Sequence, residues 1–284
     1  MITHNGTYLL HATHHGMPIY AATMGGKMVI GWLQSATLQA IVAAFGAEGT
    51  EVIAKTNDYL NRIATTDPQR ALLLAGFINE DPLLVCSLVE TSKTRWLVGD
   101  GALWFKLPVI ITRENCNTLQ IKARLTTIAT SSWRVNGKGS GNTRYFGIGS
   151  GNTFAYGNSS DIETNTSATA YIGKPLDYDL DYFNGKYEVK HGADIIHQNT
   201  FTPSAVTGSN PLSLFAWNNG STAGNIFAAS VAVAEYGFAN EVAYRFVPFN
   251  DHGTICLLDI VSLTTTEQTG NGIATIQLTD KTPA

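Results

Sequence analysis

The sequence predicts a mainly β protein in which residues 94–284 form a β-sandwich. A small β-hairpin segment and a short helical subdomain precede it. Charged residues make up only 14% of the chain, against about 25% in average soluble proteins, and Gly, Ser, Thr and Asn take their place. Apolar residues alternate with polar ones in several runs, and polar turn clusters separate these runs at near-regular spacing. Many short strands between polar turns are typical of a sandwich or barrel.

The length and charge of the chain limit the function classes. Its 284 residues, 44% of them hydrophobic, allow one large or two ordinary domains with a packed core. The net charge of -4 provides no electrostatic footprint for nucleic acid. Nucleic acid is therefore not an expected partner.

The cysteines, the first residues and the apolar runs indicate the compartment in which the protein is expected to fold. Cys86, Cys116 and Cys256 are widely separated and resemble neither a disulfide framework nor a zinc knuckle. We expect small buried hydrophobic residues in a reducing compartment, with one disulfide left open as an alternative. Residues 1–6 have no basic stretch followed by an apolar one, so no secretory signal is expected. No run approaches the roughly 18 apolar residues of a membrane span, so no membrane insertion is expected.

Residues 1–32 are predicted to form a small β anchor segment. Short apolar runs around Leu9, Ile19 and Val29 are separated by Gly16 and by Gly25-Gly26, and glycines of this kind mark hairpin turns. So small a β unit buries little surface alone. We therefore expect it to pair with another chain or to dock on a larger body.

Residues 33–93 change to a helical period and predict a short helical subdomain. Ser35 is expected to cap a first helix and Thr50 to start a second. Asp67-Pro68 and Asp81-Pro82 each place an N-cap acid before a proline at the first helical position. The pattern predicts four short helices.

Beyond the helical subdomain an alternation of period two takes over. Apolar residues at alternate positions from Leu119 to Leu125 predict a half-buried strand. The same alternation occurs at Phe227, Ala229, Val231 and Val233, and at Val242, Tyr244 and Phe246. Asn184-Gly185 lies between two strand-like runs and predicts a hairpin with a type I′ turn, which needs positive φ at both central residues.

Four segments of this β region form an ordered series. They are DYFNGK at 181–186, NPLSLFAWNNG at 210–220, YRFVP at 244–248 and GTICLLD at 253–259. The series closely resembles the C-terminal half of concanavalin A-like (LamG-type) domains in proteins of gut Bacteroidales bacteria and their phages. The segment 96–111 resembles that family's opening strand, and Tyr145-Phe146-Gly147 and Phe154-Ala155-Tyr156-Gly157 resemble its middle.

The resemblance implies a concanavalin A-like β-sandwich, or jelly roll, for residues 94–284. It implies this fold far better than any activity, because its motifs are core strands and structural turns. Thr266-Glu267-Gln268 replaces the family's aromatic close, so we expect the last strand to pair differently. The helical subdomain has no counterpart in the family. Residues 1–32 resemble the short repeats that begin many phage structural proteins.

The acidic residues do not predict catalysis. Glycan-cleaving relatives of this fold carry an E-x-D-x-x-E arrangement, and retaining hydrolysis needs two carboxyls about 5 Å apart. The nearest candidates are Asp177, Asp179 and Asp181, which would share one strand face. They could bind a hard cation, but a solvated strand face with Tyr178 and Leu180 inward is favoured.

No other motif predicts a metal site, a cofactor or a nucleophile. His11, His14 and His15 form an H-x-x-H-H cluster, but a spacing of three does not place His11 and His14 on one strand face. A turn-and-strand role is therefore expected. The chain has no nucleophile elbow, no P-loop lysine motif and no G-x-G-x-x-G after a strand. We expect a non-enzymatic protein without cofactor.

Glycan recognition is the activity that the aromatic residues allow. Trp133, Tyr145, Tyr156 and Trp217 are predicted in or beside loops, near Asn142, Asn218 and Asn219. Aromatic faces can cover the C–H surface of sugar rings while amides pair with hydroxyls, although a core position is the alternative for any single ring. The predicted site comprises Trp217, Asn218, Asn219, Tyr145 and Tyr156, with Trp217 as its strongest member.

Together these features predict a bacteriophage virion structural protein: a head fibre, capsid decoration or tail-associated component. It would assemble in the host cytoplasm and be exposed on the particle surface, which explains an adhesive protein without an export signal. The N-terminal zones would contact other virion proteins, a homo-oligomer is expected, and the sandwich would bind host or mucosal glycans. A bacterial carbohydrate-binding module and a glycan hydrolase are the alternatives.

Overall fold

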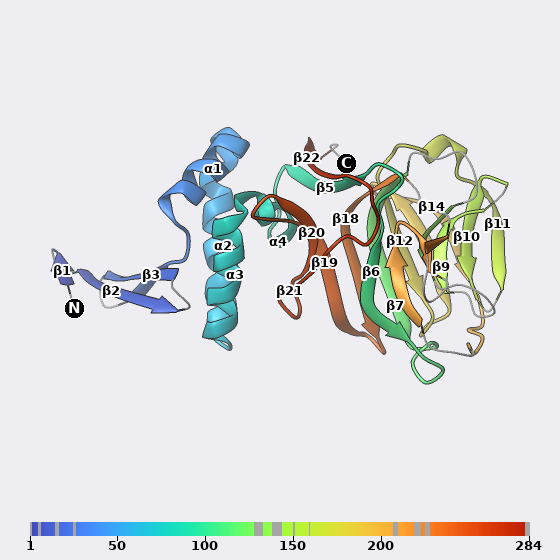
Figure 1. The fold of residues 1–284 in the computed structure, drawn as a ribbon, viewed down its shortest axis with the longest axis horizontal. Helices are drawn as coiled ribbons and strands as arrows, with labels where there is room; N and C mark the ends of the chain where they lie inside the picture. The colour runs from blue at the N-terminus through green and yellow to red at the C-terminus, as the bar shows by residue number, and fades with distance from the viewer. Residues whose placement is uncertain are drawn as a thin grey trace. The chain divides into compact units, whose positions relative to one another are not determined.

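The computed structural model divides the chain into two compact units, Met1–Lys93 and Thr94–Ala284. It describes residues 2–4, 7–14, 17–24, 27–127, 133–137, 144–149, 151–158, 160–206, 210–218, 223–224 and 228–281. Figure 1 shows the helices and strands of both units.

The first strands form a separate four-stranded antiparallel sheet in chain order. They are β1 (Ile2–His4), β2 (Thr7–His14), β3 (Met17–Met24) and β4 (Lys27–Gly31). This agrees with the predicted β segment, whereas the predicted turns at Gly16 and Gly25-Gly26 lie outside the described residues. His11 and His14 belong to β2, and His15 is also outside the description.

The helical part follows with α1 (Ser35–Phe45), η1 (Gly46–Glu48), α2 (Gly49–Ala64), α3 (Pro68–Glu80), η2 (Pro82–Leu84) and α4 (Val85–Leu88). The prediction for Asp67 is confirmed, because its carboxylate accepts a hydrogen bond of 2.9 Å from the backbone N–H of Arg70. Asp81 makes no such cap bond, and only a 3₁₀ turn and a four-residue helix follow it. Ser35 was wrongly placed as a cap; it is the first helical residue, and Gln34 occupies the N-cap.

No described helix is by itself long and apolar enough to cross a membrane. Only as a bent pair, with an angle of 117°, do Pro68–Glu80 and Pro82–Leu88 meet the requirements of length and composition.

The C-terminal unit is a sandwich of two sheets, which confirms the predicted fold class. The smaller sheet has the order β11-β10-β9-β8-β15-β6. Its strands are β6 (Phe105–Ile111), β8 (Trp133–Gly137), β9 (Tyr145–Ile148), β10 (Thr153–Gly157), β11 (Asp161–Ser167) and β15 (Asn210–Leu214). Neighbouring strands are antiparallel.

The larger sheet has the order β14-β13-β12-β7-β18-β19-β20-β21, and its neighbours along this path are also antiparallel. Its strands are β7 (Leu119–Thr127), β12 (Leu176–Asp181), β13 (Lys186–His191), β14 (Asp194–Thr200), β18 (Ala229–Phe238), β19 (Glu241–Asp251), β20 (Thr254–Asp259) and β21 (Thr264–Thr266). Along the chain, η3 (Thr169–Tyr171) lies between β11 and β12. The strands β16 (Trp217–Asn218) and β17 (Ala223–Gly224), which come between β15 and β18 in the chain, form a separate antiparallel pair.

The first and last strands of the sandwich are paired. β5 (Lys93–Gly99) lies beside both β18 and β22 (Ala274–Asp280). The indole Nε1 of Trp96 donates a hydrogen bond of 2.9 Å to Thr279 Oγ1. The last strand therefore closes the sheet against the opening strand, where the sequence predicted a departure from the family's pattern.

The core lies between the two sheets. The Phe146 ring of the smaller sheet stacks on the Tyr178 ring of the larger one, with centroids 4.7 Å apart. The alternation predicted for 119–125 is confirmed, since Leu119, Ile121, Ala123 and Leu125 are all buried. Cys116 and Cys256 are also buried, Cys86 is half-buried, and none of the three cysteines forms a disulfide.

Two other predicted inward positions are wrong. A bulge between Val231 and Val233 shifts the register of β18, so Val233 pairs with Arg124 on the outer face. Val242 is 50% exposed, because another bulge lies between Tyr236 and Gly237, opposite it. A bulge changes which residues of a strand face the core.

The hairpin at Asn184-Gly185 exists, but its turn is not type I′. Asp181 pairs with Lys186, so the loop has the four residues 182–185, and of these only Gly185 has positive φ. The Asp181 carboxylate accepts hydrogen bonds from the backbone N–H (2.9 Å) and side-chain amide (2.7 Å) of Asn184. A Cβ on Gly185 would lie 2.1 Å from the backbone oxygen of Phe201, which excludes any other residue.

Candidate functional site

Charged side chains gather on the outer face of the larger sheet. Inward residues of β12, such as Tyr178 and Leu180, enter the core, and because strand side chains alternate, their neighbours point outward. The outward residues are Lys186, Glu188 and Lys190 on β13, Asp177, Asp179 and Asp181 on β12, Gln120, Lys122 and Arg124 on β7, Glu235 on β18 and Arg245 on β19.

The strand register aligns these residues into a row across five strands. Glu188 pairs with Asp179, Asp179 with Lys122, Lys122 with Glu235, and Glu235 with Arg245. Directly opposite residues have Cβ atoms about 5 Å apart. Cations and carboxylates therefore lie at sheet-defined spacing.

This face holds a groove with a volume of about 360 Å³, which we call the sheet-face groove. It is lined by four cations and four carboxylates: Lys122, Arg124, Lys190, Arg245, Asp177, Asp179, Glu188 and Glu235. Equal numbers of both charges make the groove amphoteric, and Val233 and Ala123 add apolar surface between them.

Glu188 is the most firmly held carboxylate of the groove. Its carboxylate forms ion pairs with Lys186 Nζ at 2.8 Å and with Lys190 Nζ at 2.6 Å, and its side chain is only 5% exposed. The hydrogen bonds from these two lysines lower the pKa of Glu188. Glu188 is therefore ionised at neutral pH and already paired with two lysines.

Asp177 and Asp179 are held more loosely. Burial raises the pKa of both carboxyls, against the opposing effect of Arg124 on Asp177 and of Lys122 on Asp179. Arg124 Nε is 3.9 Å from Asp177 Oδ1, a distance too long for a strong hydrogen bond.

Several polar atoms of the groove retain unused hydrogen-bonding capacity. Within the described part of the chain, Asp179 Oδ1, Arg124 Nε and Arg245 Nε are buried and have no hydrogen-bond partner. A carboxylate accepts and a guanidinium donates. Each sugar hydroxyl both donates and accepts, so a hydroxyl-bearing ligand could engage an acid and a cation of the groove together.

The prediction for the acidic stripe is confirmed in its geometry. Asp177, Asp179 and Asp181 share one outward strand face, and Tyr178 points inward. The three carboxylates do not converge closely enough to share an ion. Asp181 instead binds the hairpin residue Asn184.

Two members of the predicted glycan site are wrong. Tyr145 and Tyr156 are 3% and 2% exposed, so neither ring offers an open face to a sugar. The Tyr156 ring packs in the core against Tyr187, with centroids 5.1 Å apart.

The other members of that site remain a prediction. Trp217 and Asn218 lie in β16, while Asn219 and Asn142 lie outside the described residues, as do the side chains of Trp217, Asn218 and Trp133.

The groove residues on β7, β18 and β19 were missed by sequence reasoning. The signal was the alternation of Lys122 and Arg124 with apolar residues, which identifies an outward face. Nothing local shows that Glu235 and Arg245, over a hundred positions later, lie beside it.

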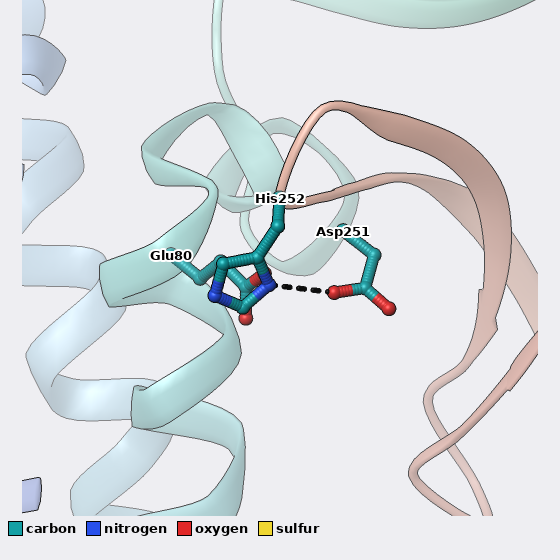
Figure 2. Close-up of side chains that lie close together, drawn as sticks. All are labelled: Glu80, Asp251 and His252. Atoms are coloured by element: carbon teal, nitrogen blue, oxygen red, sulfur yellow. Dashed lines mark hydrogen bonds and ion pairs between the residues drawn. The ribbon is translucent and has the colours of Figure 1, made fainter.

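His252 has a neighbouring acid in the structure. Its Nδ1 lies 2.9 Å from Asp251 Oδ1 at the exposed turn between β19 and β20 (Figure 2). Glu80, which Figure 2 also shows, belongs to the other unit, Met1–Lys93.

No protein-family model and no curated protein matches this chain. Three solved structures are similar to parts of it. A candidate carbohydrate binding protein from Bacteroides ovatus shares 9% identity over 66% of this chain and 60% of its own, with a TM-score of 0.42. A native heptameric SAP-like pentraxin from Limulus polyphemus shares 7% identity over 52% of this chain and 77% of its own, with a TM-score of 0.35. The Ruminococcus gnavus IT-sialidase CBM40 bound to alpha2,6 sialyllactose shares 11% identity over 58% of this chain and 86% of its own, with a TM-score of 0.28. At these identities and TM-scores the likeness is confined to the β-sandwich class of fold.

Proposed function

We propose that the C-terminal sandwich is a glycan-binding module and that the sheet-face groove is its binding surface. The observation that supports this most is the set of buried donor and acceptor atoms without a hydrogen bond in that groove, on Asp179, Arg124 and Arg245, of which the two arginines have only long ion pairs, at 3.9 Å to Asp177 and 4.0 Å to Glu235. Unpaired buried polar groups are costly, and a polyhydroxyl ligand would satisfy them. Because the groups are on β12, β7 and β19 of one hydrogen-bonded sheet, the strand order sets their spacing before binding.

A groove of this kind binds weakly at a single site. Open sugar sites have dissociation constants on the order of millimolar, or about -4 kcal/mol. Linked copies gain avidity without new contacts. The function therefore calls for many copies on one surface.

The proposal includes a place for the chain in a bacteriophage particle. The N-terminal unit attaches to other virion proteins, and the sandwich faces outward towards host or mucosal glycans. Support comes from the division into two compact units, the low content of charged residues and the resemblance of the β region to phage-encoded lectin-like domains. Trp217, next to Asn218 and Asn219, remains a separate candidate contact for glycans, because β16 pairs with β17 outside the larger sheet.

The test compares two lysine substitutions on opposite sheets. Lys122→Gln removes an exposed cation from the groove, and Lys106→Gln removes an exposed cation from β6, outside the groove. Both proteins are displayed multivalently on a glycan array. Binding by the wild type and Lys106→Gln, with loss in Lys122→Gln, is expected.

Equal binding by both variants would contradict the groove as the site. Absence of any array signal under multivalent display would contradict glycan binding itself. Labelling of this chain on purified particles tests the virion location separately, and distinguishes it from a bacterial carbohydrate-binding module.

A further inference from the structure

A second groove lies at the open edge of the sandwich. Among the described strands, β11 pairs only with β10, and β14 pairs only with β13. These two edge strands, one from each sheet (Figure 1), line a groove with a volume of about 500 Å³. This volume is within the usual range for small-ligand sites. We call it the edge groove; it has no lining residue in common with the sheet-face groove.

The lining of the edge groove is polar but almost uncharged. It includes Thr164, Asn165 and Thr166 of β11 and His197, Gln198 and Asn199 of β14. Hydroxyls and amides both donate and accept hydrogen bonds. Ile195, which is 52% exposed, adds an apolar surface. This combination matches a sugar, which presents hydroxyls at its rim and C–H groups on its faces.

The groove is formed before any ligand arrives. Thr166 Oγ1 and His197 Nδ1 are 2.9 Å apart, and this hydrogen bond joins the edge strands of the two sheets. The imidazole is 9% exposed and packs against the Phe154 and Tyr187 rings, at centroid distances of 6.0 and 5.3 Å. Asn199 Nδ2 donates to Tyr156 Oη at 3.3 Å.

His197 has unused hydrogen-bonding capacity on its second ring nitrogen. Its Nε2 has no partner within the described part of the chain. Burial lowers the pKa of His197, so the imidazole is neutral at neutral pH. Among the residues that the structure describes, Glu163 is the only carboxylate that lines the groove. A neutral ligand therefore suits this groove better than an ionised one.

The edge strands themselves disfavour the other obvious occupant, an added peptide strand. β11 presents Asp161 and Glu163, both exposed, along its length, and β14 has a register shift at Val189/Lys190 of its neighbour. Charged residues and bulges are the features by which edge strands avoid pairing with foreign strands. Residues 163–166 of β11 and 195–199 of β14 line the groove, which is a length of about 15 Å, enough for a short oligosaccharide.

We infer that the edge groove is a second binding site, specific for neutral, hydroxyl-rich oligosaccharides. It rests on the proposed function only for the class of ligand, because its residues are separate. One sandwich would then engage two glycan segments, and the avidity of a multicopy surface would rise accordingly.

The experiment is a titration of the isotopically labelled full chain with unbranched neutral oligosaccharides of glucose and of mannose, followed by amide chemical shifts. Shifts are expected in 161–167 and 194–200. Asn165→Ala and Gln198→Ala each remove one exposed amide of the groove and should weaken binding about tenfold, as for the loss of one hydrogen bond. Gln277→Ala, an exposed amide on β22, is the matched control and should bind like wild type.

The outcomes separate the two sites. Shifts at the edge strands that survive Lys122→Gln support the edge groove even if the sheet-face proposal fails. Shifts confined to β7, β12 and β13 that disappear in Lys122→Gln support the sheet-face groove and overturn the edge groove. Binding of an unrelated extended peptide to β14, without any response to the oligosaccharides, would also overturn it.

Discussion

The guanidinium carbon of Arg144 lies 4.1 Å from the centre of the Tyr182 ring in the interior of the sandwich. Both side chains are fully buried. The same guanidinium donates hydrogen bonds to the backbone oxygen of Cys116 (3.3 Å), to Asn117 Oδ1 (3.1 Å) and to the backbone oxygen of Ser204. One cation thus holds the turn before β7 and the segment after β14 against the start of β9.

Arg144→Ala should lower the free energy of unfolding by roughly 3 kcal/mol, because several buried oxygens lose their donor and the cation–π contact is lost. Arg144→Lys should restore only part of the loss, since an ammonium lacks the planar fork of donors. Urea denaturation of the isolated variants measures both. Arg113→Ala, an exposed arginine of the neighbouring turn, is the control. A loss no larger than that of the control would show that Arg144 has no structural role.

His197 predicts a pH dependence of stability. Burial places its pKa in the folded protein below the reference value of 6.5. The unfolded chain therefore binds more protons between the two pKa values, and stability falls as the pH drops below about 6.5. Asp177 and Asp179, whose pKa values are raised, change stability in the opposite direction. Their effect cancels when wild type is compared with a variant that lacks only His197.

As the pH falls from about 7.5 to about 5.5, the melting temperature of His197→Gln should therefore fall less than that of wild type, because glutamine does not titrate. Melting curves at closely spaced pH values measure this difference. Parallel curves for the two proteins would show that His197 does not titrate differently on unfolding.

The acids of the sheet-face groove predict an absence of hydrolysis. Asp179 and Glu188 lie opposite each other on neighbouring strands, and their pKa values are moved in opposite directions, as in an acid and nucleophile pair. Glu188, however, is neutralised by two lysines and is 5% exposed. Purified protein should therefore release no reducing ends from bacterial capsular or mucin glycans. Turnover that survives purification and is lost in Asp179→Asn would make the protein a hydrolase.

Residues 1–32 predict an attachment role. Their four-stranded sheet, β1–β4, pairs only with itself among the described strands, and sheets this small are marginal alone. A chain without residues 1–32 should keep a folded sandwich, seen by an unchanged thermal transition, yet fail to enter particles. Incorporation at the level of the full chain would remove the anchor role of this sheet.

The prediction for Trp217 concerns binding of whole particles and not the stability of the fold. Trp217→Ala should leave the thermal midpoint nearly unchanged while it reduces attachment of whole particles to glycan-coated surfaces. Trp104→Ala, which removes an indole that is 8% exposed, is the comparison for a buried tryptophan and should lower the midpoint by several degrees. A similar drop for Trp217→Ala would place its ring in the core.

Local patterns in the sequence were sufficient for much of the fold. Asp67 before Pro68 predicted the cap of α3, and the alternation around Ile121 predicted which side of β7 is buried. Positions that depend on long-range register were not predictable. The bulge beside Val233 reverses its face, and the four-residue loop at Gly185 follows from the pairing of Asp181 with Lys186.

The candidate site was predictable only in part for the same reason. Asp177 and Asp179 could be assigned to one outward face, because strand alternation is local. Their cationic neighbours come from β7 and β19, and only the order of strands in the sheet brings Lys122 and Arg245 into the same groove. Tyr145 and Tyr156 follow turn clusters in sequence, but the sheet pairing carries both rings into the interior.

The pairing of β5 with β22 brings the first and last strands of the sandwich together. The hydrogen bond from Trp96 to Thr279 shows that the chain enters and leaves this unit at nearly the same place. A unit with adjacent ends can be inserted into a surface loop of another protein without separating the flanking residues of that loop. Such a unit could therefore be transferred between proteins by recombination, and the recipient would have to accommodate a single point of attachment.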